Sequence, residues 1–106
     1  MNILAFGYDL SADLGYPPSW LAPKIQGWET HTASHCTVVF DGENQEFATG
    51  SLKAAIKGPW VQYVDAAGER GYLGKAELYR RSMVLVPAGE DAYIVDLFRV
   101  SGGEVH

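Results

Sequence analysis

The chain has little cysteine, few basic residues and no long apolar run, and each shortage excludes a class of protein. Cys36 is the single cysteine, so the chain cannot form an internal disulfide, and its redox compartment stays open. Eight Lys and Arg against thirteen Asp and Glu give a net charge of −5, which argues against nonspecific nucleic-acid binding. No apolar run approaches the ~18 residues of a membrane-spanning helix.

The length and composition are those of a folded globular domain. The 106 residues can form one domain with one core, and 47% of them are hydrophobic. The sequence contains no repeat, no low-complexity segment and no linker. Residues 1–106 are therefore predicted to form a single β domain or part of one. The chain begins and ends next to stretches that read as structure, so we expect a segment of a larger protein.

Short apolar runs separated by Gly, Pro and Asp turns predict an antiparallel β-sandwich. Residues 3–6 and 10–14 predict a hairpin broken at 7–9 and ended at 15–18, with a short helix as the alternative. The segment 19–32 is irregular, and Ser19 could cap one helical turn. Later strands are expected at 36–40, 45–47, 60–65, 77–86 and 92–101, whereas 51–57 fits a strand or a helix.

His35 is the most informative residue because it precedes the apolar run 36–40. A histidine at the end of a strand can be a neutral metal ligand or a general base at pH 7. Its neighbour Cys36 would begin the strand and point to the opposite face, so we expect Cys36 to pack. His31 lies four residues earlier in a loop, too far along an extended chain to be presumed a partner.

Arginine and tryptophan residues offer further binding chemistry. Arg80 and Arg81 are predicted to straddle a strand, one facing solvent and the other paired with a carboxylate such as Asp96. Binding a substrate carboxylate is the alternative, since arginine forks suit carboxylates. The three tryptophans could stack on sugar rings, although packing is their commoner use: Trp20, Trp28 and Trp60.

Four stretches form an ordered set of motifs along the chain: 13–16 (DLGY), 34–42 (SHCTVVFDG) with Gln45, 79–86 (YRRSMVLV), and 93–103 (YIVDLFRVSGG) with His106. Together they resemble the heparinase II/III-like family of polysaccharide lyases. The family has a helical (α/α) toroid followed by antiparallel β-sheets. The resemblance covers nearly the whole chain but only the central β portion of such a protein.

The resemblance implies a zinc site. In zinc-containing members, a histidine of an upstream His-Gly-His motif joins an aspartate and a later histidine, and the matching positions here are Asp13 and His35. The upstream histidine is absent from this sequence. Two ligands should hold zinc weakly or not at all in the isolated chain. The family usually has Asn at the position of Cys36. Because the resemblance implies Asp13 and His35 as zinc ligands, it disfavours a role for His35 as a general base.

The function implied by the resemblance is β-elimination in an acidic polysaccharide such as a glycosaminoglycan or alginate. The tyrosine and histidine that the family uses for proton transfer match no position here, so this segment should be inactive alone. A parent of that kind is expected in the periplasm or outside the cell. Open sheet edges favour a homo-oligomer.

The alternative function is a noncatalytic β-sandwich module that binds carbohydrate or mediates assembly. A metal-dependent cupin-like barrel is a further alternative, but the sequence lacks the clustered histidines that such a site needs.

Overall fold

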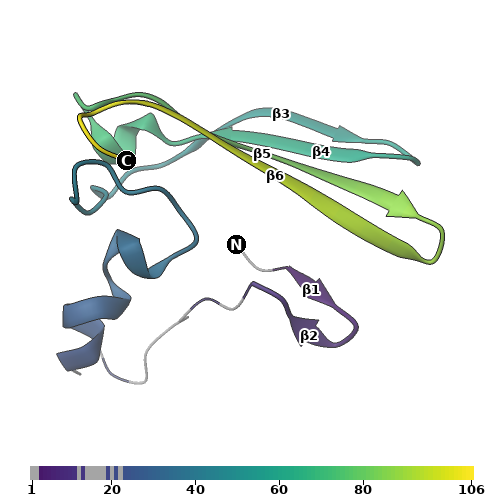
Figure 1. The fold of residues 1–106 in the computed structure, drawn as a ribbon, viewed down its shortest axis with the longest axis horizontal. Coiled ribbons are helices and arrows are strands. Elements are labelled where there is room, and N and C mark those ends of the chain that lie inside the picture. The colour runs from purple at the N-terminus through teal and green to yellow at the C-terminus, as the bar shows by residue number, and fades with distance from the viewer. Residues whose placement is uncertain (1–2, 12, 14–18, 20, 22) are drawn as a thin grey trace.

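The computed structural model describes residues 3–11, 13, 19, 21 and 23–106, and these contain six strands in two antiparallel sheets (Figure 1). The strands β1 (Leu4–Ala5) and β2 (Tyr8–Asp9) pair as a short hairpin. The larger sheet is a meander in chain order, made of β3 (Ser51–Lys57), β4 (Gln62–Ala67), β5 (Ala76–Ala88) and β6 (Asp91–Gly102). The predicted all-β antiparallel architecture is confirmed.

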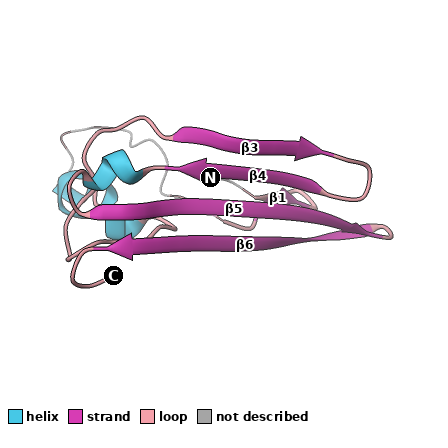
Figure 2. Cartoon of the chain, turned by 90° about the horizontal axis from the view of Figure 1, so that it is seen from above, coloured by secondary structure: helices cyan, strands magenta, loops and turns pink. Residues whose placement is uncertain are grey.

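Short helical turns gather at one end of the large sheet (Figure 2). They are η1 (Ile25–Glu29), η2 (Thr32–Ser34) and η3 (Glu69–Tyr72). Among the described residues, none of the helical segments has the length and apolar character needed to cross a bilayer. The Ser19 hydroxyl accepts a hydrogen bond from the Leu21 amide at 3.3 Å, which is a local turn contact. Residues 15–18, which were predicted to end the first hairpin, lie outside the described residues.

The long β5–β6 hairpin fixes which side chains share a face of the sheet. Arg81 lies opposite Phe98 and Ser82 lies opposite Leu97, and paired residues project on the same side. We call the side of Arg81 the cleft face and the side of Asp65 and Ser82 the Asp65 face. Gly89 turns the hairpin with φ of +70°, a conformation that glycine adopts without strain.

The hydrophobic core lies on the cleft face at the end of the sheet that carries the helical turns. Phe40, Tyr72 and Tyr79 form its buried centre, with Phe98 and Val100 packed against them. The Phe40 side chain is completely buried, and its ring centroid lies 5.0 Å from that of Tyr72. Tyr79 meets Phe98 edge to face at 4.9 Å. Such aromatic pairs add about 0.5–1.5 kcal/mol beyond area burial.

The other half of the large sheet carries apolar side chains that remain exposed on both faces. Val64 and Ile94 lie on the cleft face, and Ile56, Tyr93 and Val95 lie on the Asp65 face; all are exposed. A two-faced apolar sheet of this kind is typical of strands that are covered on both sides.

The predicted strands at 36–40 and 45–47 are wrong. Within these segments only Phe40 makes an isolated bridge, to Glu43, and the rest of both segments is loop. The run 36–40 has the composition of a strand, but its backbone groups form hydrogen bonds within local turns and with side chains of β5 instead of with a neighbouring strand. The first hairpin exists, but it turns at Phe6 and Gly7, and its second strand is β2 (Tyr8–Asp9) instead of 10–14, of which residues 12 and 14 are not described.

The ambiguous segment 51–57 is a strand. It pairs along β4 from Ser51 opposite Ala67 to Lys57 opposite Gln62, with a register shift between Leu52 and Ala54. Leu52 and Ile56 are exposed, so no apolar helical stripe is buried here. Pairing of backbone groups across the sheet decided between the two alternatives that side-chain spacing left open.

A buried carboxylate organises the Asp65 face. Asp65 is 1% exposed, and both of its oxygens accept bonds from the Arg80 guanidinium. The Ser82 hydroxyl donates to Asp65 Oδ1 at 3.2 Å, and Arg99 lies 4.0 Å from the same oxygen. The hydrogen bonds from Arg80 hold the pKa of Asp65 well below its usual range. The network ties β4, β5 and β6 together.

We predict that Asp65→Asn lowers the melting temperature by several degrees and that Asp96→Asn lowers it less. Asp65 is buried and shares its charge with Arg80, whereas the Asp96 and Arg81 side chains are about one quarter to one third exposed. Thermal unfolding followed by circular dichroism measures both variants. Equal losses would contradict the buried network.

The Asp65–Arg80 pair also predicts that the protein loses stability at acid pH. Because the folded-state pKa of Asp65 lies below its unfolded value of about 3.9, the stabilisation is complete above that pH and is lost as the pH falls through the folded pKa. The wild-type melting temperature should therefore drop more steeply below about pH 4 than that of Asp65→Asn. Parallel curves for the two proteins would argue against this linkage.

Candidate functional site

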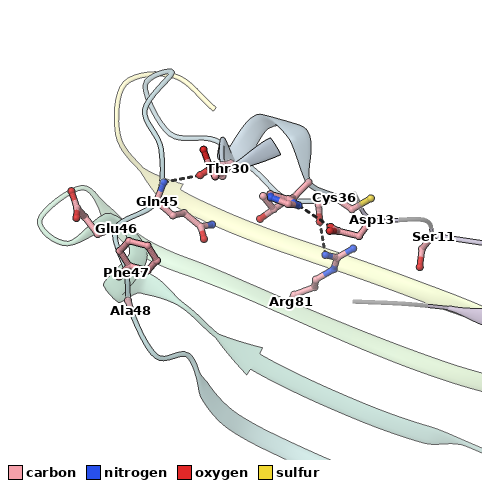
Figure 3. Close-up of a pocket in the computed structure, with 12 residues that line it drawn as sticks. Ser11, Asp13, Thr30, Cys36, Gln45, Glu46, Phe47, Ala48 and Arg81 are labelled. Atoms are coloured by element: carbon pink, nitrogen blue, oxygen red, sulfur yellow. Dashed lines mark hydrogen bonds and ion pairs between the residues drawn. The ribbon is translucent and has the colours of Figure 1, made fainter. Parts of the chain in front are cut away.

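A polar cleft of about 660 Å³ opens beside the core, at the same end of the large sheet. In Figure 3, Asp13, Cys36 and Arg81 lie on one side of it, and Gln45 and Phe47 lie on the other. The cleft thus collects residues from the N-terminal segment, the loop after η2 and strand β5. It also contains both residues that the family resemblance implies as metal ligands.

The loop that carries His35 is shaped by reciprocal hydrogen bonds with the segment around Gln45. The Thr32 amide donates to Asn44 Oδ1 at 2.9 Å, and the Gln45 amide donates to Thr32 Oγ1 at 2.7 Å. Thr32 is 6% exposed, so these bonds are sheltered from water. Turn η2 then ends at Ser34, and the next residue, His35, caps it by donating its amide to the Thr32 carbonyl at 3.1 Å.

A tight turn places His35 and Cys36 on the same cleft. The Thr37 amide donates to the His35 carbonyl at 2.8 Å, which closes a three-residue turn around Cys36. Both side chains line the cleft, and Cys36 is exposed. The prediction that Cys36 packs on the face opposite His35 is wrong, because it assumed the alternation of a strand.

Asp13 and His35 are in direct contact, 22 positions apart in the sequence. The distance from His35 Nδ1 to Asp13 Oδ2 is 2.8 Å, and the side chains are 37% and 31% exposed. In the neutral histidine, a proton on Nδ1 would be donated to the carboxylate, and Nε2 would then offer a lone pair. In that tautomer, the Nε2 lone pair could bind a cation.

The donor set suits zinc in either of two arrangements. Two ligands of a tetrahedral zinc at about 2.0–2.1 Å from the metal lie about 3.3 Å apart, so the 2.8 Å contact needs only a small opening. Alternatively, Asp13 stays on Nδ1 and orients the ring while Nε2 binds the metal. Within the described ranges, no cluster of three His, Cys, Asp or Glu side chains is present. The zinc role of Asp13 and His35 stays a prediction.

Arg81 borders the cleft but is already engaged. Its Nε and Nη2 donate to the two oxygens of Asp96 at 2.9 and 2.5 Å, and its Cζ lies 5.4 Å from the Phe98 ring centroid. The remaining Nη1 donates to the Cys36 carbonyl at 2.6 Å. The pairing with Asp96 raises the pKa of Arg81. Arg81 thus anchors the His35 loop to β5. The predicted pairing of one arginine with Asp96 is confirmed for Arg81. The expectation that the other arginine faces solvent is wrong, because Arg80 pairs with the buried Asp65.

The Tyr79 hydroxyl joins the same loop to the core. It donates to the Val38 carbonyl at 2.6 Å and accepts from Gln45 Nε2 at 2.5 Å. Since the single hydroxyl proton goes to Val38, the Thr37 hydroxyl at 2.5 Å acts as the donor to Tyr79. Burial raises the pKa of Tyr79, so the neutral form with its one proton is kept. Sequence reasoning missed this role, although Tyr79 and Gln45 both stand in the motifs of the resemblance.

The remaining candidate residues that the structure describes do not line the cleft. Trp60 is 82% exposed in the turn between β3 and β4, Trp28 is 50% exposed, and Trp20 lies outside the described residues. Neither Trp28 nor Trp60 lines the cleft, and His31 does not line it either. His106 is exposed but stacks on Phe40 with ring centroids 5.4 Å apart.

We predict that Tyr79→Phe destabilises the chain by about 1–3 kcal/mol, because it leaves the Val38 carbonyl and the Gln45 amide without their partner. Tyr72→Phe is the matched control, since the Tyr72 hydroxyl makes one bond, to the Glu43 carbonyl at 3.0 Å. That variant should lose about 1 kcal/mol. Urea unfolding measures both, and a larger loss for Tyr72→Phe would refute the role assigned to Tyr79.

Comparison of the chain with protein-family models, with curated proteins and with solved structures found no match. The assignment of the site therefore depends on the geometry of Asp13 and His35 and on the motifs in which they stand.

Proposed function

We propose that this chain forms the central β portion of a heparinase II/III-like polysaccharide lyase and supplies Asp13 and His35 to its metal site. The observation that carries the proposal is the 2.8 Å contact between these two side chains. The family resemblance implies them as ligands of one zinc, and they come from distant parts of the sequence.

The charge of the cleft supports a bound cation. Asp13 and Glu46 line it, and the positive charge of Arg81 is balanced by Asp96. The surplus is negative, which a divalent cation would offset and an acidic substrate alone would not. A polysaccharide with uronic acids would therefore approach this cleft more readily once a metal is bound.

The motifs of the resemblance meet in space, which is a second support. Phe40 of the second motif packs on Tyr79 of the third, with ring centroids 5.7 Å apart. The Asp41 carboxylate accepts the amides of Glu104 and Val105, which follow the fourth motif, at 2.7 and 2.9 Å. Gly103 has φ of +66°, and a Cβ there would lie 2.6 Å from the Phe40 ring. Conformation and space both require glycine at this point.

The proposed reaction breaks the bond on the C4 side of a uronic acid by β-elimination. The substrate carboxylate must be neutralised, the C5 proton removed and the leaving oxygen protonated. Zinc would supply a positive centre held by Asp13 and His35 beside the cleft. No residue of this chain is assigned to proton transfer, so the chemistry belongs to a protein that also contributes other residues.

We predict that the protein encoded by the complete open reading frame around this chain contains about one zinc per chain. His35→Ala should lower that content, because it removes the imidazole ligand, whereas His31→Ala should leave it unchanged, since His31 does not line the cleft. Elemental analysis by mass spectrometry measures the metal. The same zinc content in His35→Ala and wild type would contradict the site.

The lyase reaction has its own test. The same full-length protein should release unsaturated products, detected by ultraviolet absorbance, from at least one acidic polysaccharide in a panel of glycosaminoglycans and alginates. A neutral polysaccharide is the negative control. A zinc-containing protein that cleaves none of the acidic polymers would keep the metal site and exclude the lyase assignment.

A carbohydrate-binding module is the second candidate, and the exposed Trp60 favours it. An indole that is 82% exposed at a turn is available to stack on a sugar ring. Titration of the 106-residue chain with oligosaccharides would then show binding that Trp60→Ala abolishes and Trp28→Ala retains. Absence of binding by the wild-type chain would exclude this candidate.

A further inference from the structure

Strand β6 (Asp91–Gly102) is an outer edge of the large sheet. The strand order is β3-β4-β5-β6, and among the described residues no strand lies on the far side of β6 (Figure 2). Its outward N–H and C=O groups can therefore pair with an added strand. The strand is twelve residues long, and its Tyr93, Val95 and Leu97 side chains are 54%, 39% and 52% exposed.

The sequence of β6 is complementary to itself in one register. A two-fold axis between two antiparallel copies of an edge strand must pass through one residue, because opposed residues share a face. With the axis at Val95, Asp91 lies opposite Arg99 of the partner copy. Tyr93 lies opposite the partner's Leu97, and Val95 lies opposite itself. All of these side chains project on the Asp65 face.

Neighbouring registers lack this match. An axis at Asp96 sets two aspartates against each other, and an axis at Leu97 sets Arg99 against Val95. Asp91 is exposed, and the Arg99 side chain is 52% exposed. Arg99 Nη2 donates to Ser82 Oγ at 3.2 Å and lies 4.0 Å from Asp65 Oδ1, so the pair with Asp91 of the partner copy would use the other guanidinium N–H groups. Asp96 projects on the cleft face, where it pairs with Arg81 of its own sheet, so it adds little unbalanced charge to the interface.

We propose that the edge of β6 pairs antiparallel with β6 of a second copy of this chain, with the two-fold axis at Val95. The product is a continuous eight-stranded sheet. Two Asp91–Arg99 pairs flank an apolar row of tyrosine, valine and leucine on its Asp65 face. The pairing uses neither Asp13 nor His35 and does not depend on the proposed metal site.

Charge reversal tests the register. Sedimentation velocity of the 106-residue chain should show a concentration-dependent dimer. Asp91→Lys sets a lysine against Arg99 at both ends and should weaken the dimer about tenfold. Glu90→Lys makes the same charge change one residue earlier, in the hairpin turn, and should leave the dissociation constant within about twofold. A monomer at all concentrations, or equal effects of the two substitutions, would overturn the proposal.

Disulfide cross-linking independently tests whether the two-fold axis lies at Val95. In a Cys36→Ser background, Val95→Cys should form an intermolecular disulfide under mild oxidation, because the two thiols face each other. Tyr93→Cys should not, since the two copies of position 93 lie four positions apart along the paired strands. Cross-linking at position 93 but not at position 95 would contradict the register.

Discussion

The Tyr79 hydroxyl is the contact on which the site depends. It takes hydrogen bonds from Gln45 and Thr37 and gives one to the Val38 carbonyl, so one oxygen joins β5 to both loops that line the cleft. These loops have no strand pairing of their own apart from the Phe40–Glu43 bridge. A buried polar group that is fully satisfied fixes one arrangement, because any displacement leaves groups without partners in a low-dielectric interior. The position of His35 follows from this anchor, with Arg81 adding a second one at the Cys36 carbonyl.

The large sheet carries charge in two different ways. On the Asp65 face, a buried carboxylate is held by Arg80, Ser82 and the more distant Arg99, and it serves stability. On the cleft face, Asp96 holds Arg81, and Arg81 in turn holds the loop. Because Arg80 and Arg81 are both paired within the sheet, the other polar groups of the cleft include the partly exposed Asp13–His35 pair, Cys36 and Glu46. The pairing of both arginines argues against direct recognition of a substrate carboxylate by either of them.

The sequence could predict the long hairpin strands but not the loops. The runs 77–86 and 92–101 are apolar and β-branched between strong turns, and β5 and β6 extend them by a few residues. The run 36–40 is richer in β-branched residues and is still not a strand, because its backbone groups bond locally and to Tyr79. Composition shows which segments are able to form a strand. Whether a segment does form one depends on which groups pair with its backbone N–H and C=O groups. Asp13 and His35 were found through the motif resemblance, and their contact could not follow from spacing, since the two residues lie 22 positions apart in the sequence.

The central claim is that His35 binds a metal ion, with Asp13 either as a second ligand or as the carboxylate that orients the histidine ring. A crystal of the full-length protein grown with zinc, with diffraction recorded on both sides of the zinc absorption edge, tests it most directly. The account predicts an anomalous peak within about 2.2 Å of a His35 ring nitrogen, with the Asp13 carboxylate either on the metal or on the other ring nitrogen. A fully occupied zinc elsewhere, with Asp13 and His35 still bonded only to each other, would contradict it.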